Sequence, residues 1–109
     1  VCQNNEGQIN DTESISAGLD YPGVSPIHCF LKDTKRARYT SATDEAALAA
    51  YKLVTRLEKI NPSLEPSHAF AEAIKIAPKL NEDTIIIVNS CGDAKKDRDI
   101  LKARLGKIN

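Results

Sequence analysis

The stretch TIIIVN at 84–89 most constrains what this chain can fold into. Three isoleucines and a valine follow one another, and β-branched side chains suit a strand better than a helix. An unbroken apolar run of this kind is typical of a strand that is buried on both faces inside a parallel sheet. A second, shorter strand is predicted at 37–42, where ARYTSA alternates and carries β-forming residues.

Helical patterns surround these two strands, at about 26–35, 44–59, 67–77 and 96–105. The resulting order is helix, strand, helix, helix, strand, helix, which indicates an α/β protein with a parallel sheet. Two strands leave both edges of a sheet open and bury little surface. We therefore expect helices packed on a small parallel sheet that is an incomplete part of a larger three-layer domain.

Several helix boundaries are marked in the sequence. Ser25 before Pro26 and Thr43 before two acidic residues are typical N-terminal caps, and Gly106 is typical of a C-terminal one. The helix at 44–59 should bury an apolar stripe made of Ala47, Ala50, Tyr51, Val54 and Leu57. The helix at 67–77 should bury Phe70, Ala73, Ile74 and Ala77.

The bulk composition excludes several classes of protein. The 109 residues suffice for one domain, and 15 basic residues balance 15 acidic ones. This neutrality gives no electrostatic reason to expect nucleic acid or an anionic membrane as a partner. The apolar run at 85–88 is too short to span a bilayer, and the polar start shows no signal peptide. The expected location is a soluble compartment, cytoplasmic or plastid-like.

The chain has three widely spaced cysteines, Cys2, Cys29 and Cys91. An odd number without close pairs fits neither a disulfide framework nor a zinc site, so reduced thiols are expected. The chain also begins without methionine, which leaves open a processed product or a piece of something larger.

Three stretches are candidate sites. SISAGLDYPGV at 14–24 places Asp20 in a loop rich in turn-forming residues. Asp20 is either an ordinary turn aspartate or an acid that faces a substrate. SCGD at 90–93 follows the predicted strand. It is either an ordinary turn with a small buried cysteine, or a site where backbone amides and the thiol face a ligand. LEPSHAF at 64–70 places Glu65, Ser67 and His68 at a helix start. They are a candidate site or, alternatively, a capping Ser67 with a solvated Glu65 and a surface His68.

Taken together, these stretches resemble one known family. SISAGLDYPGV, LKDTKRARYTSATDEAALAAYKLVTRLE, PSLEPSHAFAEAIKIAP and IIIVNSCGDAKKD resemble, in order, the carboxy-terminal part of the tryptophan synthase β chain. That family consists of fold type II pyridoxal-phosphate enzymes that condense L-serine with indole. The resemblance implies that 1–109 is a carboxy-terminal segment of such a domain, with the remainder of the β chain and an α chain as partners.

The resemblance also implies roles for individual residues. Asp20 matches an aspartate on the hydroxyl side of the substrate serine, and Glu65 matches a glutamate beside the cofactor ring. Cys91 takes the place of a serine that hydrogen-bonds the pyridine nitrogen. Its neighbours Ser90 and Gly92 are assigned to cofactor binding with it. Backbone carbonyls around Tyr21 and Gly23 match positions that help to hold a monovalent cation.

The chain departs from the family in ways that bear on these roles. The family usually reads NLSGRGDKD where this chain reads NSCGDAKKD, so Asp93 and Ala94 replace an arginine and a glycine. The Schiff-base lysine motif, the glycine-rich phosphate loop and the catalytic acid loop have no counterpart here. The terminal GKIN is similar to the lysine motif HKIN but lacks its context, so Lys107 is not expected to bind the cofactor.

Two functions follow as hypotheses. In the first, the chain is the carboxy-terminal part of a tryptophan synthase β-type enzyme and is not catalytic alone. In the second, it is a free-standing truncated relative that acts as a non-catalytic folding or interaction module.

Overall fold

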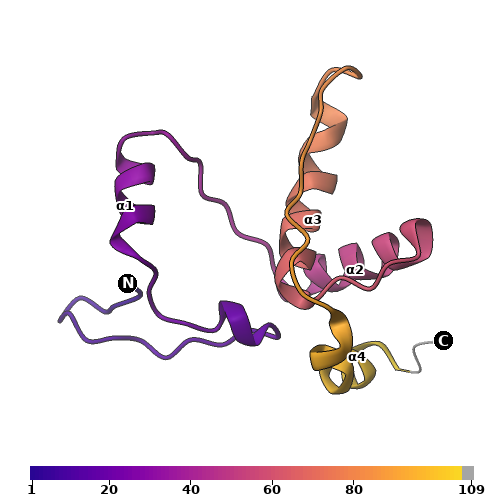
Figure 1. Cartoon of the computed structure of the whole chain (residues 1–109). Coiled ribbons are helices and arrows are strands. Elements are labelled where there is room, and N and C mark those ends of the chain that lie inside the picture. Colours follow the sequence, from indigo (N-terminus) through magenta and orange to yellow (C-terminus); the bar gives the residue numbers. More distant parts are fainter. Residues whose placement is uncertain (107–109) are drawn as a thin grey trace. The chain divides into compact units, whose positions relative to one another are not determined.

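A computed structural model describes residues 1–106, and Lys107 lies outside the described residues. The described chain is helical, with three short 3-10 helices beside the α-helices (Figure 1). It divides into two compact units, residues 1–40 and the residues from Ser41 onward. The α-helices are α1 (Pro26–Asp33), α2 (Asp44–Glu58), α3 (Leu64–Ile76) and α4 (Arg98–Leu105).

The first unit is a looped terminal segment followed by α1. Residues Gln3 and Ile9 form an isolated antiparallel bridge, and the Cys2 amide donates to the Pro22 carbonyl at 2.6 Å. Ser25 caps α1 as predicted, since its side chain accepts from the Ile27 amide at 3.3 Å. Large apolar side chains of α1 remain exposed, with Ile27 at 67% and Phe30 at 60%.

The predicted strand at 37–42 is wrong, because these residues are coil. Tyr39 instead shares a hydrogen bond with the Nδ1 atom of His28 on α1, at 2.9 Å from its hydroxyl. A strand needs a hydrogen-bonded neighbour along its length, and none of the described residues supplies one to this segment.

The second unit is built on the packing of α2 against α3. Thr43 caps α2 as predicted by accepting from the Ala46 amide at 3.2 Å, and the helix ends where Lys59 adopts a left-handed φ of 59°. The predicted stripe of α2 is confirmed at four of its five positions, and Leu57 is the exception at 62% exposure. The buried apolar side chains of this unit are Ala47, Ala50, Tyr51, Val54, Leu64, Ala94 and Leu101.

Helix α3 begins at Leu64, three residues before the predicted start at Ser67. Ser67 is therefore inside the helix, and its hydroxyl donates to the Ser63 carbonyl at 2.8 Å. The expected apolar face of α3 is also wrong in part, since Ile74 is 41% exposed and burial concentrates at the start of the helix. After α3 the chain passes through the short helix η2 (Ala77–Lys79).

The predicted strand at 84–89 is likewise absent from the described residues, and the segment is coil. It returns from the end of α3 to the start of the same helix, and Figure 1 draws it in orange. Ile85 and Ile87, which alternate onto the same side of this extended segment, are 85% and 91% exposed, whereas Ile86 between them is 39% exposed. The helices of the predicted α/β fold are confirmed, but the described residues contain no sheet.

The last predicted helix is divided in two. A 3-10 turn, η3 (Ala94–Asp97), leads directly into α4. Gly106 ends α4 as predicted, with φ of 74° and its amide bound to the Lys102 carbonyl at 3.0 Å. None of the described helices is long and apolar enough to cross a membrane.

Candidate functional site

The segment 91–97 lies against the start of α3, although about thirty residues separate the two in sequence. The Ser63 hydroxyl donates to the Cys91 carbonyl at 3.1 Å, and the Ala94 amide donates to the Asn61 carbonyl at 3.2 Å. The Leu64 amide donates to the Asp97 carboxylate at 2.8 Å. We call the contacts of 91–97 with Ser63, Leu64 and Glu65 the clasp.

Asp97 explains why α3 starts early. The first amides of a helix have no partner within the helix, and a carboxylate is a good acceptor for them. Asp97 supplies that acceptor to Leu64 from 33 residues away, and it is only 3% exposed. Because this carboxylate comes from a distant part of the chain, the local sequence around 64–67 could not show it.

Lys96 completes the clasp through its ammonium group. Its Nζ lies 2.8 and 2.9 Å from the two Glu65 carboxylate oxygens and 2.6 Å from Asp97 Oδ1. Burial lowers the pKa of Lys96, but the hydrogen bonds and negative charges of Asp97 and Glu65 outweigh it, so the pKa is raised. The lysine is therefore held as a cation between two carboxylates.

Gly92 is required by the close approach of the two segments. Its φ is +84°, which a side chain disfavours. A Cβ built on it would meet the Ser63 hydroxyl oxygen at 2.8 Å. The backbone at Gly92 can thus pass the start of α3 only without a side chain.

The clasp brings together one predicted site residue from each segment, Glu65 and Cys91. Glu65 is partly buried and paired with Lys96, whereas the alternative to a functional site expected a solvated Glu65 side chain. Cys91 has a free, exposed thiol, and Ser90 beside it is also exposed. His68 is less exposed than the surface position expected for it, and its Nδ1 lies 2.7 Å from the Leu64 carbonyl.

The other predicted site residues belong to the first unit. Asp20 is exposed and ends the 3-10 helix η1 (Ala17–Leu19), with its amide 3.4 Å from the Ala17 carbonyl. Tyr21 is 68% exposed on the coil that follows, and Gly23 packs near Val1. No group of three or more His, Cys, Asp or Glu residues suited to a metal occurs within residues 1–106.

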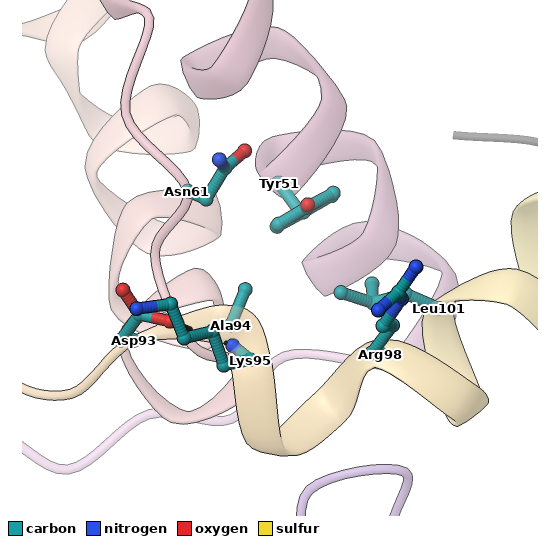
Figure 2. Close-up of a pocket in the computed structure, with 7 residues that line it drawn as sticks. All are labelled: Tyr51, Asn61, Asp93, Ala94, Lys95, Arg98 and Leu101. Carbon is teal, nitrogen blue, oxygen red and sulfur yellow. Dashed lines mark hydrogen bonds between the residues drawn. The ribbon is translucent and has the colours of Figure 1, made fainter. Parts of the chain in front are cut away.

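A cavity of about 270 Å³ opens beside the clasp, between α2 and α4 (Figure 2). Its apolar lining residues Tyr51, Ala94 and Leu101 are buried, whereas the charged lining residues Asp93, Lys95 and Arg98 are exposed. The lining residues are Tyr51, Asn61, Asp93, Ala94, Lys95, Arg98 and Leu101.

Sequence reasoning missed Ser63, Lys96 and Asp97. The adjacent lysine and aspartate at 96–97, just before a helix, indicate side chains that could bind the free amides of a helix start. Nothing in the sequence indicated that the helix in question was α3 rather than α4.

In this arrangement a thiol-bearing turn and an ion-paired carboxylate are held together at one helix start. Comparison with known proteins then gives the relationship. No family model matches the chain. The chain is 53% identical over 106 residues to the tryptophan synthase beta chain of Bordetella petrii, which covers 97% of this chain and 27% of that protein.

Two further relatives agree. The tryptophan synthase beta chain of Cereibacter sphaeroides is 54% identical over 106 residues, or 97% of this chain and 26% of that protein. That of Allorhizobium ampelinum is 55% identical over 97 residues, or 89% and 24%. The chain is thus homologous to the carboxy-terminal portion of tryptophan synthase beta chains, and it spans about a quarter of their length.

Proposed function

We propose that this chain forms one wall of the active site of a tryptophan synthase β-type enzyme, which condenses L-serine with indole to give tryptophan. The observation that carries the proposal is an identity above half with a tryptophan synthase beta chain, over nearly the whole chain. The clasp supports it, because two segments that resemble cofactor-contacting parts of that enzyme are joined by hydrogen bonds. The partners would be the remainder of the β chain and an α chain.

The residues of the clasp fit the ring side of pyridoxal phosphate. The exposed Cys91 thiol is a weak donor and a weak acceptor, which suits an uncharged ring nitrogen. Glu65 offers a carboxylate whose position the Lys96 ammonium fixes. Ser90 and Gly92 would border the same ring from the turn. When bound, this cofactor supplies an electron sink for chemistry at the amino acid's α carbon.

Different residues of this chain would then contact the cofactor, the substrate and a cation. Cys91 would keep the ring nitrogen uncharged, because a thiol, unlike a carboxylate, does not favour its protonation. Glu65 would hold an acceptor beside the ring. Asp20, exposed at the end of η1, would orient the serine hydroxyl and accept a hydrogen bond from it. The carbonyls of Tyr21 and Gly23 would contribute to a monovalent cation site.

The same proposal accounts for the run at 84–89. In the complete enzyme we infer that it becomes a strand of a parallel sheet, paired on both edges by strands from the rest of the β chain. The exposure of Ile85 and Ile87 supports this, since two such side chains are rarely left in water together.

A chimeric enzyme tests the proposal. These 109 residues would replace the matching quarter of the Bordetella petrii relative, and tryptophan formation from serine and indole would be measured with added pyridoxal phosphate. We expect an active chimera. The 109-residue chain alone should make no tryptophan and should show no cofactor absorption band after dialysis. A chimera that folds and contains no cofactor would refute the proposal. Tryptophan formation by the 109-residue chain alone would refute the claim that this segment needs the rest of the enzyme for catalysis.

Cys91 gives a sharper arm of the same experiment. Cys91→Ser should keep the activity of the chimera within about tenfold, which corresponds to about 1.4 kcal/mol of barrier. Cys91→Asp should change the absorption spectrum of the bound cofactor, because a carboxylate favours a protonated ring nitrogen. Cofactor should slow alkylation of Cys91 but leave Cys2, the control, equally reactive. Equal alkylation of Cys91 in both states would remove it from the site.

A further inference from the structure

Neither the resemblance nor the relatives' names assign a role to Lys96, yet its ammonium contacts two carboxylates. Its ammonium touches both oxygens of Glu65, at 2.8 and 2.9 Å, and one oxygen of Asp97, at 2.6 Å. Its side chain is 49% exposed, whereas those of Glu65 and Asp97 are 21% and 3% exposed. The lysine thus reaches from the surface to hold two less accessible carboxylates.

These contacts close into a ring that begins and ends on α3. The Leu64 amide donates to Asp97 Oδ2, and the other Asp97 oxygen accepts from Lys96. Lys96 then donates to Glu65, which is the residue after Leu64. The position of the Glu65 carboxylate is therefore fixed relative to the helix that carries it.

A glutamate side chain has three rotatable bonds, and holding it in one arrangement costs entropy. One neutral donor would hold only one oxygen. An ammonium that touches both oxygens restricts the rotation of the whole carboxylate and favours its charged form. The buried Asp97 in turn prevents the flexible Lys96 from moving away into solvent.

We propose that Lys96 is a positioning residue, which holds the Glu65 carboxylate charged and aligned for the cofactor. This role rests on the proposed function, because Glu65 acts beside a cofactor only in that enzyme. It adds a residue that acts through Glu65 and does not itself touch the ring.

The test combines the 109-residue chain with the chimera. In the chain alone, NMR would follow the titration of the Lys96 ammonium. Glu65→Gln should bring the raised pKa of Lys96 back towards its ordinary value, because one of its two anionic partners becomes neutral. An unchanged titration would overturn the proposal whatever happens to the cofactor.

In the chimera, Lys96→Met should lower kcat by about 10- to 100-fold, the scale for a displaced group, with a smaller change in KM. It should also shift the absorption of the bound cofactor, and Lys96→Arg should restore most of both. Lys95→Met is the matched control. Lys95 donates to Asp93 Oδ1 through its backbone amide, at 2.7 Å, and the substitution leaves that amide in place. Circular dichroism would show that each variant is folded.

The outcomes separate the two proposals. An unmodified chimera that folds and binds no cofactor refutes the proposed function and, with it, this role. A chimera that binds cofactor and is equally damaged by Lys95→Met, or is not rescued by Lys96→Arg, overturns the positioning role alone.

Discussion

The clasp and the run at 84–89 are neighbours in sequence, yet they have opposite outcomes in the fold. The clasp joins polar and charged residues, and there the Asp97 side chain and Ser63 are almost fully buried. The run has the most hydrophobic sequence in the chain, yet Ile85 and Ile87 stand in solvent. The segment that hydropathy marks as core is exposed, whereas the charged turn beside it buries the Asp97 carboxylate.

The difference lies in how many partners each structure needs. A helix start needs only a few acceptors, and a single turn can supply them through Asp97. A central strand needs two neighbouring strands along its whole length. Residues 1–106 offer the first and not the second. The described residues, which belong to a chain spanning about a quarter of a relative's length, thus contain this helix-start network and no sheet.

The largest expected effect is on the stability contribution of the run at 84–89, which should differ between the chain alone and the chimera. In the chain alone, Ile87→Asp should change the free energy of unfolding by less than about 0.5 kcal/mol, because Ile87 is 91% exposed. In the chimera the same change should cost about 3 kcal/mol or more, since a charge would be buried in the sheet. Urea unfolding of both proteins measures this, with Asn81→Asp as the control. Equal, small costs would mean that 84–89 stays outside any sheet.

The next effect concerns the buried carboxylate of the clasp. Asp97→Ala should destabilise the second unit by about 2–3 kcal/mol, because it leaves the Leu64 amide and the Lys96 ammonium without this acceptor. Asp97→Asn should cost less, since it keeps an acceptor but not the charge. Thermal melts followed by circular dichroism would test this. Asp99→Ala, an exposed acid two residues on, should be nearly neutral, and equal costs at 97 and 99 would contradict the capping role.

A smaller effect is expected where the two segments pass closest. Gly92→Ala should cost about 1–2 kcal/mol from its positive φ, and further because the new Cβ meets the Ser63 hydroxyl. Gly106→Ala is the control, with φ of +74° and nothing within 4 Å of the added carbon. In a double-mutant cycle, Ser63→Ala should relieve part of the cost at 92. Additive costs would show that the two residues do not interact.

The smallest effect is the dependence of stability on pH through Lys96. Its folded pKa lies above the ordinary value of 10.5, so the folded state binds this proton more tightly. The resulting stabilisation is complete below that ordinary value and is lost as the pH rises through the folded pKa. Lys96→Met should therefore lose less stability than the wild type as the pH rises above that ordinary value. Urea unfolding with Lys95→Met as the control tests the sign, and a steeper loss in Lys96→Met would reverse it.

Much of the helical structure was predictable because its causes are local. Ser25, Thr43 and Gly106 each act within a turn of their own helix, so the sequence placed these boundaries correctly. The stripe on α2 followed from spacing alone, except that Leu57 extends beyond the part of α2 that is covered. The likeness to the beta chains was also readable, since it rests on stretches of contiguous residues.

The candidate site was predictable only in its parts. Only the family resemblance placed Glu65 and Cys91 beside the same cofactor, and no local sequence pattern joined them. The contacts that hold their segments together, from Ser63 to Cys91 and from Leu64 to Asp97, cross 28 and 33 residues. Such pairings depend on how the chain returns along α3, which no local pattern specifies.

The sequence by itself determined where the helices lie, which residues are apolar and which family the chain is similar to. The tertiary structure decided which apolar residues are buried and where α3 begins. Burial depends on a partner surface, and a helix start depends on an acceptor, and both can come from anywhere in the chain. That is why Asp97 is buried while Ile87 is not.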